Sequence, residues 1–254
     1  MTDFSFTAGV TDAVLGQPRS LADPFPDRFV VLLANSKGGC GKTTLSTSLA
    51  SQYAARGQHV SLLDLDPQQS ASQWHRARRQ AGRDDIQLLS LPVDASFQPA
   101  RLRAVLRDAG ERLIIDSPAG LSGVALDSLL RIARVVMIPV LPSPIDIRAV
   151  TRFVQTVMLS ETYRRRPQRL AVIANRSRER TRTYGQLERF LNSLKIPFLA
   201  TLRDTQLYVR AAGDGVGLLD LIEASAEDQQ QWRLIIEWLE IQRHLIRSRP
   251  AVAW

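Results

Sequence analysis

Short runs of apolar residues alternate along the chain with longer stretches whose apolar positions repeat at helical spacing. Seven runs are typical of strands buried on both faces: 29–35, 59–66, 86–92, 112–118, 135–142, 169–175 and 196–202. Helices are predicted over 42–56, 69–81, 122–133, 145–161 and 183–194, and a long C-terminal helix over 226–247. This alternation predicts an α/β fold with a mostly parallel, doubly wound sheet flanked by helices.

Residues 1–27 differ from the rest of the chain because they show no sustained period and contain two glycines and three prolines. They are predicted to form a flexible N-terminal leader. Residues 28–254 are predicted to form one domain that ends in the C-terminal helix. A length of 254 residues and an apolar content of 44% are sufficient for a sizeable core.

The composition excludes several classes of protein. The single cysteine, Cys40, permits neither a disulfide framework nor a zinc cluster within one chain. No run of eighteen apolar residues occurs, and the first residues lack the basic start and apolar block of a signal peptide. We therefore expect a cytoplasmic protein and no membrane partner.

The stretch NSKGGCGKTT, which we call the phosphate loop (residues 35–44), lies between the first apolar run and a predicted helix. It fits the pattern G-x-x-x-x-G-K-[ST] except that Ser36 replaces the first glycine. We expect backbone N–H groups and the helix N-terminus to bind phosphates, Lys42 to bridge the β and γ phosphates, and Thr43 to ligate Mg²⁺. The nucleotide-binding candidates are Lys37, Gly38, Gly39, Cys40, Gly41, Lys42, Thr43 and Thr44. A coincidental loop is the alternative, which the strand and helix on either side disfavour.

Polar side chains end three other apolar runs, and in parallel sheets ligands bind at the carboxyl ends of strands. Asp64 and Asp66 lie at the end of the second run, Asp116 lies near the end of the fourth, and Asn175 ends the sixth. Asp116 is in the position of a carboxylate that holds water in the Mg²⁺ shell. The amide of Asn175 could read the adenine edge. A role as a helix cap or turn former is the alternative for each of these residues.

Positive charge is unevenly distributed, since the chain contains thirty arginines but only three lysines, Lys37, Lys42 and Lys195. Two of the lysines lie in the phosphate loop, where a compact ammonium suits a phosphate oxygen. Residues 148–182 alone carry a net charge of +8, ten basic against two acidic groups, which equals the excess of the whole chain. This segment suggests salt-sensitive, non-specific DNA binding, with a solvated charged surface as the alternative.

The sequence resembles a known family, the dimeric ParA/MinD ATPases with a deviant phosphate loop. Within this family it is most similar to the short ParA-type partition ATPases. The matching motifs are SKGGCGKTT (36–44), LLDLDPQQSAS (62–72), LIIDSPAG (113–120), IPVLPSPIDIRA (138–149) and LRDTQLYVRAA (202–212). The resemblance implies a domain that binds ATP and Mg²⁺, sandwiches two nucleotides in a homodimer, and hydrolyses ATP slowly until a partner stimulates it.

The resemblance also assigns roles to individual residues. Lys37 would be the signature lysine, which reaches across the dimer to the phosphates of the other subunit, and Asp66 would orient the attacking water. Thr43, Asp64 and Asp116 would lie at the magnesium. The candidate DNA contacts are Arg164, Arg165, Arg166, Arg178, Arg180, Arg182, Arg203 and Arg210.

The leader is too short for the helix-turn-helix domain of the longer partition ATPases. The sequence therefore predicts a nucleoid-associated, cytoplasmic ATPase that positions a plasmid, a chromosome origin or a protein assembly with a ParB-like or cargo-adaptor activator. A MinD-like membrane ATPase is the main alternative, because residues 232–250 combine apolar and basic side chains. A metabolic or metal-delivery enzyme is less favoured, since metal carriers of this superfamily need paired cysteines.

Overall fold

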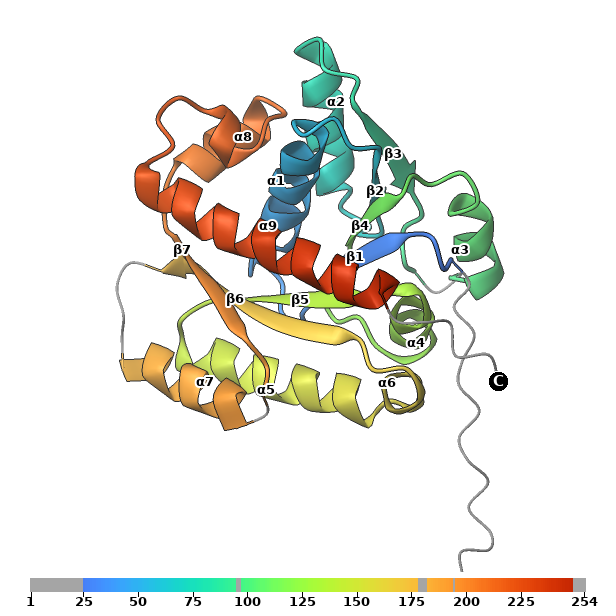
Figure 1. Ribbon diagram of the computed structural model, residues 1–254, viewed down its shortest axis with the longest axis vertical. Coiled ribbons are helices and arrows are strands. Elements are labelled where there is room, and N and C mark those ends of the chain that lie inside the picture. Colours follow the sequence, from blue (N-terminus) through green and yellow to red (C-terminus); the bar gives the residue numbers. More distant parts are fainter. Residues whose placement is uncertain (1–24, 95–96, 178–181, 194, 249–254) are drawn as a thin grey trace, which may run out of the picture.

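The computed structural model describes residues 25–94, 97–177, 182–193 and 195–248. Within these ranges one sheet of seven strands runs in the order β3-β2-β4-β1-β5-β6-β7, and each pair of neighbours is parallel (Figure 1). The strands are β1 (Phe29–Leu33), β2 (Val60–Asp64), β3 (Ile86–Ser90), β4 (Arg112–Asp116), β5 (Val135–Val140), β6 (Arg169–Ser177) and β7 (Phe198–Arg203). All seven predicted strands are therefore present.

The helices are α1 (Lys42–Ala54), α2 (Ser70–Gln80), α3 (Pro99–Val105), α4 (Gly123–Ile132), α5 (Pro144–Leu159), α6 (Glu161–Arg165), α7 (Arg182–Ser193), α8 (Leu207–Gly213) and α9 (Ala226–Arg247), with a 3₁₀ turn, η1 (Leu218–Asp220). The six predicted helices are confirmed as α1, α2, α4, α5, α7 and α9. Helices α3, α6 and α8 were not predicted, because five to seven residues are too few to establish a helical period.

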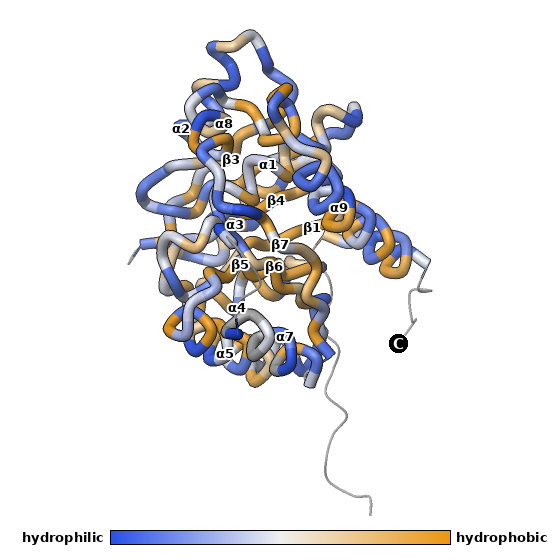
Figure 2. Tube along the Cα trace, turned by 90° about the vertical axis from the view of Figure 1, so that its left-hand side faces the viewer, coloured by the Kyte–Doolittle hydropathy of each residue, from blue (hydrophilic) through white to orange (hydrophobic). Residues whose placement is uncertain are grey.

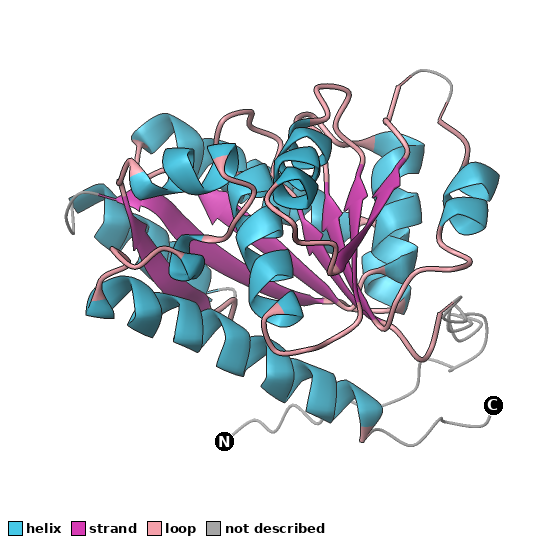
Figure 3. Cartoon of the chain, turned by 90° about the horizontal axis from the view of Figure 1, so that it is seen from above, coloured by secondary structure: helices cyan, strands magenta, loops and turns pink. Residues whose placement is uncertain are grey.

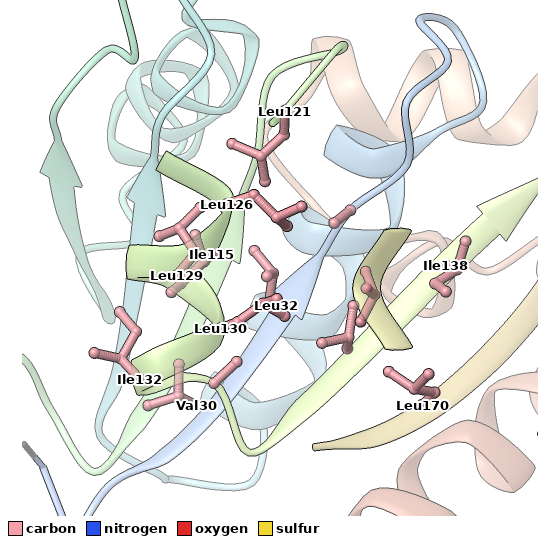
Figure 4. Close-up of a cluster of buried hydrophobic side chains, with 14 of the residues drawn as sticks. Val30, Leu32, Ile115, Leu121, Leu126, Leu129, Leu130, Ile132, Ile138 and Leu170 are labelled. Carbon is pink, nitrogen blue, oxygen red and sulfur yellow. The ribbon is translucent and has the colours of Figure 1, made fainter. Parts of the chain in front are cut away.

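The helices form a layer on each face of the sheet (Figures 1 and 3). Helices α1, α2, α8 and α9 contribute to one hydrophobic cluster, and α3 to α7 contribute to the other. Figure 4 shows part of the second cluster, where Leu126, Leu129 and Leu130 of α4 lie against Val30 and Leu32 of β1. The predicted doubly wound α/β fold is confirmed.

Burial follows the position of each strand in the sheet. The interior strands β1, β2, β4 and β5 are buried along their whole length, and the fifth interior strand, β6, is buried at all but two of its nine positions. Figure 2 shows the hydrophobic residues of β1, β4 and β5 at the centre of the molecule. The edge strands β3 and β7 are buried only at some positions, so the expectation of burial on both faces is wrong for these two. An apolar run alone does not distinguish an edge strand from a central one.

The parallel topology brings the polar residues at the carboxyl ends of the strands together at one end of the sheet. Strand β1 lies between β4 and β5, and in the register of the sheet Asp116 is paired with Leu33 of β1 and with Asp64 of β2. The phosphate loop leaves β1 at this same end. The predicted domain boundary at residue 28 stays a prediction, because most of the proposed leader lies outside the described residues.

Candidate nucleotide-binding site

The phosphate loop turns sharply between β1 and α1 because two of its glycines have left-handed backbone. Gly39 has φ +72° and Gly41, the residue before α1, has φ +97°. No side chain caps this end of α1 and its first turn has no acidic residue. The first N–H groups of the helix are therefore free of side-chain acceptors, which suits the binding of an anion.

The two lysines of the loop have different surroundings. The Lys42 side chain is buried, with 6% of its surface exposed, and its Nζ donates to the Lys37 backbone oxygen at 2.9 Å. The Lys37 N–H donates to Asn35 Oδ1 at 3.2 Å, and Asn35 Nδ2 donates to the Pro139 oxygen at 2.7 Å. These bonds orient the Lys37 backbone inward and connect the loop to β5.

Asp116 is fully buried at the end of β4 and contacts α1. Its Oδ2 accepts from the Thr43 hydroxyl at 2.7 Å, and its Oδ1 accepts from the Ser46 hydroxyl at 3.1 Å. The pKa of Asp116 is raised to about 7, mainly by burial; the negative charge of Asp64 also raises it, whereas the bonds from Thr43 and Ser46 lower it. Ser46 was not predicted, although it lies three residues after Thr43 and so on the same side of α1.

The two aspartates after β2 differ in what their carboxylates contact. Asp64 is buried; its Oδ2 accepts from the Ser72 N–H and hydroxyl at 2.8 and 2.7 Å, and its Oδ1 accepts from the Asp66 N–H at 3.1 Å. Asp64 thus acts as the acceptor at the start of α2, and its place near magnesium stays a prediction. Asp66 is partly exposed and also accepts from the Gln68 N–H, at 2.9 Å.

A cavity of about 1310 Å³ opens beside the phosphate loop. Its lining includes Gly41, Lys42, Thr43 and Asp66, together with three residues that were not predicted to belong to the site, Trp74, Gly120 and Arg176. The described residues contain no group of three or more His, Cys, Asp or Glu side chains that could hold a metal. The hydroxyl of Thr43 beside the Asp116 carboxylate fits Mg²⁺ instead, because this cation is commonly held by one or two side chains together with waters and phosphates.

Asn175 and Cys40 are buried behind the loop. Asn175 Nδ2 donates to the Cys40 oxygen at 2.9 Å, and Asn175 Oδ1 accepts from the Arg176 N–H at 3.0 Å. A Cβ atom on Gly41 would lie 1.9 Å from Asn175 Nδ2, so the amide occupies the space beside that glycine. Burial raises the pKa of the Cys40 thiol, which keeps it protonated. The adenine contact of Asn175 stays a prediction.

The sequence comparison identifies the family. The CobQ/CobB/MinD/ParA nucleotide-binding domain matches residues 31–218, a range that includes the phosphate loop, both aspartates after β2 and Asp116. The chain belongs to this family. Among its relatives, the "Maintenance of carboxysome distribution protein A" of Halothiobacillus neapolitanus is 30% identical over 197 residues, which are 76% of this chain and 88% of the relative. The "Chromosome-partitioning ATPase Soj" of Thermus thermophilus is 34% identical over 134 residues, 43% of this chain and 53% of Soj.

Solved structures of the family share the fold. Apo McdA of Cyanothece superposes with a TM-score of 0.66 and 16% identity, over 84% of this chain and 99% of McdA. MinD of Pyrococcus horikoshii, in a complex with Mg-ADP, gives a TM-score of 0.61 and 18% identity, over 85% of this chain and 98% of MinD. As a ParA/MinD-type member of the family, the chain is an ATPase whose cofactors are ATP and Mg²⁺.

The arginines proposed for this ParA/MinD-type chain do not form one patch. Arg164 and Arg165 end α6, just before the start of β6, whereas Arg182 begins α7, beyond the end of β6 (Figure 1). Strand β6 has nine residues and so spans about 30 Å. Arg203, the last residue of β7, and Arg210, in α8, lie at the same end of the strands as Arg182. Arg178 and Arg180 lie outside the described residues.

Several of these arginines are already in ion pairs. Arg203 binds Asp228 through two nitrogens at 2.8 and 2.7 Å, and Arg210 binds Glu223 at 2.9 and 2.5 Å. Arg165 pairs with Glu161, and Arg166 donates to the Arg131 oxygen at 2.6 Å. Arg164 and Arg182 are exposed. The positive charge available to a partner is therefore smaller than the sequence total.

Helix α9 uses its apolar face within the protein. Trp232, Ile235, Ile236 and Leu239 are buried against the sheet, whereas Leu245 is 45% exposed. Within the described ranges, no helix has the length and apolar character needed to cross a membrane. The apolar residues on which the membrane alternative depended are thus mostly occupied by intramolecular packing.

Proposed function

We propose that this chain is a dimerising ATPase that binds DNA non-specifically and positions or segregates an intracellular cargo through activator-stimulated ATP hydrolysis. The family membership supports the ATPase, and the names of two relatives, which refer to carboxysome distribution and chromosome partitioning, support the output. The cargo could be a protein assembly, a plasmid or a chromosome origin. The activator would be a ParB-like or cargo-adaptor protein.

The observation that carries the proposal is the separation of the two loop lysines. Lys42 lines the cavity of its own chain, whereas Lys37 is absent from the lining and its ammonium has no hydrogen-bond or ion-pair partner in the described part of the chain. A cation that does not face its own nucleotide is suited to the phosphates of a second copy. In that position it would stabilise the charge that develops during phosphoryl transfer, as an arginine finger does.

The remaining site residues have roles that their contacts support. Backbone N–H groups at Gly38 to Thr44 hold phosphate oxygens, and Lys42 neutralises them. The Thr43 hydroxyl and the Asp116 carboxylate, 2.7 Å apart, hold Mg²⁺, with Asp64 nearby. Bound Mg²⁺ supplies charge neutralisation at the transferred phosphoryl group. Asp66, on the cavity wall, orients the attacking water.

The proposed DNA surface uses exposed arginines and would place the protein on the nucleoid in the cytoplasm. Arg164 lies near the beginning of β6, and Arg182 lies beyond the end of this strand. Neither is accompanied by base-reading motifs, which supports contact with the phosphate backbone without sequence preference. The alternative, a MinD-like membrane ATPase, is favoured only by the exposed Leu234, Ile241 and Leu245 of α9.

Retention on immobilised random-sequence duplex DNA tests the proposal. The protein is applied with ATP, with ADP or without nucleotide, at low and at high salt. We expect retention to be strongest with ATP and to fall steeply as salt rises, because phosphate contacts release counterions. Retention that ignores ATP, or that is absent at low salt, contradicts the proposal. Binding to anionic lipid vesicles in place of DNA selects the membrane alternative.

A further inference from the structure

A second pocket lies at the opposite end of the strands from the phosphate loop. It has a volume of about 270 Å³ and is lined by Gly57, Gln58, His59, Glu111, Arg112 and Arg243. Arg112 is the first residue of β4, whose last residue is Asp116 of the nucleotide site. A single water needs only about 10–15 Å³ of such space, so this pocket can hold a polyatomic ion. We call it the basal pocket.

Arg112 is a buried cation with incomplete hydrogen bonding. Its side chain is only 3% exposed; Nε donates to Gln58 Oε1 at 2.7 Å and Nη2 donates to Glu240 Oε2 at 2.8 Å. The guanidinium also stacks over the ring of Tyr53, 4.9 Å from its centre. Its Nη1 is buried and has no partner. A buried donor without an acceptor is unfavourable, particularly when it carries charge.

The neighbours of Arg112 have the same deficiency. Five buried side-chain atoms in the described part of the chain lack a hydrogen-bond partner, and four of them belong to this cluster: Tyr53 Oη, Arg112 Nη1, Glu240 Oε1 and Arg243 Nε. Buried polar groups in folded proteins are nearly all satisfied. The Tyr53 hydroxyl and the Glu240 carboxylate can satisfy each other, because these two side chains interact directly. The two guanidinium donors, Arg112 Nη1 and Arg243 Nε, are then the atoms for which another molecule, water or ligand, would supply acceptors.

The charge of the cluster favours an anion. Three guanidinium groups, of Arg112, Arg243 and Arg247, face the two carboxylates of Glu111 and Glu240. Only the pair between Arg112 and Glu240 is short, since Arg243 lies 3.5 Å from Glu111 and 3.8 Å from Glu240, and Arg247 lies 3.7 Å from Glu111. Close charge-assisted bonds measure about 2.7–2.9 Å. Burial lowers the pKa of Arg243, and the positive charges of Arg112 and Arg247 lower it further.

We propose that the basal pocket is a binding site for a phosphate group, with Arg243 and Arg112 as its principal donors. Planar guanidinium groups with unused N–H donors match the oxygen geometry of a tetrahedral oxyanion. His59, exposed at the rim, adds a further N–H donor. The site is separate from the phosphate loop and does not depend on the proposed function of the protein.

Titration with inorganic phosphate tests the site in the full chain with a non-hydrolysable ATP analogue and Mg²⁺ bound, so that the γ-phosphate position of the phosphate loop is filled as well. The side-chain Nε signals of ¹⁵N-labelled arginines are followed by NMR. We expect a saturable change in the Arg112 Nε signal, and we expect that change to be absent in Arg243→Gln, in which Arg112 is still present. The absence of any saturable change in the unsubstituted protein overturns the proposal and leaves internal water as the occupant.

Variants make the assignment specific. Arg243→Gln is expected to weaken phosphate binding about tenfold or more, because a charge-assisted bond is lost. Arg233→Gln, an exposed position on the same helix, is the matched control and should bind phosphate as the unsubstituted protein does. Equal affinities of the two variants contradict the proposal. If Arg243→Gln does not fold, Arg243→Lys keeps the charge but removes Nε, and the same comparison applies.

The source of the phosphate group is distinguished by a second titration. Glycerol 3-phosphate replaces inorganic phosphate under the same conditions. Tighter binding of the ester identifies an esterified phosphate as the natural class of ligand, whereas tighter binding of inorganic phosphate identifies the free ion.

Discussion

At the scale of single residues, the phosphate loop depends on one contact between segments far apart in the sequence. Gly41 combines a left-handed backbone with the absence of a side chain, and the Asn175 amide fills the space that a Cβ would need. The amide also donates to the Cys40 oxygen at 2.9 Å. The shape of the loop is therefore maintained by β6 as well as by its own glycines.

We predict that Gly41→Ala destabilises the protein and weakens ATP binding, since the new methyl group would collide with Asn175. Gly82→Ala is the matched control, because Gly82 has φ +77° but nothing within 4 Å of its Cβ position. Left-handed strain alone is worth about 1–3 kcal/mol. Denaturant unfolding should show a larger loss of unfolding free energy for Gly41→Ala than for Gly82→Ala. Equal losses would mean that Asn175 moves aside without penalty.

The two loop lysines should separate binding from turnover. Lys37→Ala is expected to abolish most ATP hydrolysis while nucleotide binding is retained, because Lys37 does not line the cavity of its own chain. Lys42→Ala should lose nucleotide binding itself. Steady-state hydrolysis and equilibrium binding of a fluorescent ATP analogue measure the two effects. Unchanged turnover in Lys37→Ala would refute its action across a dimer.

Part of the nucleotide site could be predicted from the sequence at this scale. Thr43 and Asp116 each follow a recognisable pattern, and the structure places their oxygens 2.7 Å apart. The bonds of Asp64 to Ser72 and of Asn175 to Cys40 could not be predicted. These bonds depend on how the elements are placed relative to one another and not on local spacing. An aspartate at the end of a strand has the same sequence pattern whether it ligates a metal or accepts hydrogen bonds at the start of a helix.

At the scale of elements, α9 is attached at its first turn by a capping box joined to β7. Ser225 and Asp228 bond reciprocally to each other's backbone, and Asp228 also binds Arg203 of β7. Burial raises the pKa of Asp228, but the bonds from Arg203 and Ser225 outweigh it and lower the pKa below its ordinary value of 3.8. The ionised carboxylate therefore stabilises the fold.

We predict that Asp228→Asn lowers the unfolding free energy at pH 7 by about 1–3 kcal/mol. Because the folded pKa is depressed, this stabilisation is complete above pH 3.8 and is lost as the pH falls through the lower folded value. The deficit of the variant relative to the unsubstituted protein should therefore shrink below that pH. Glu227→Gln, exposed in the same turn, is the control and should change stability little. An equal deficit in Glu227→Gln would attribute the effect to helix-end charge alone.

Sequence reasoning found the seven strands and the helices of ten or more residues, but it missed the helices of five to seven residues. The sixteen residues of α5 show a clear amphipathic repeat, whereas the five residues of α6 complete little more than one turn. The position of a strand in the sheet was also beyond prediction, since β7 has an apolar run but lies at the edge.

At the scale of the whole molecule, the proposed dimer makes Asp66 a test of assembly. Asp66→Ala is expected to bind ATP normally, hydrolyse it slowly and accumulate as an ATP-bound dimer, because the residue is assigned only to the attacking water. Light scattering coupled to size-exclusion chromatography with ATP measures the mass. Asp94→Ala alters another aspartate on the same cavity and should leave turnover nearly unchanged. Normal hydrolysis by Asp66→Ala would remove its proposed role.

The path of β6 has a consequence for the proposed DNA binding, because it sets the length of duplex that would reach both groups of arginines. The strand, about 30 Å long, lies between Arg164 and Arg165 near its start and Arg182 beyond its end, and one turn of B-DNA measures about 34 Å. A duplex that lies on the protein surface parallel to the direction of β6 would thus meet the two groups of arginines about one turn apart. Fragments shorter than about ten base pairs would reach only one group. Fluorescence anisotropy with duplexes of increasing length measures this. A steep loss of affinity below about ten base pairs would show that the length of β6 sets the shortest duplex that contacts both groups of arginines.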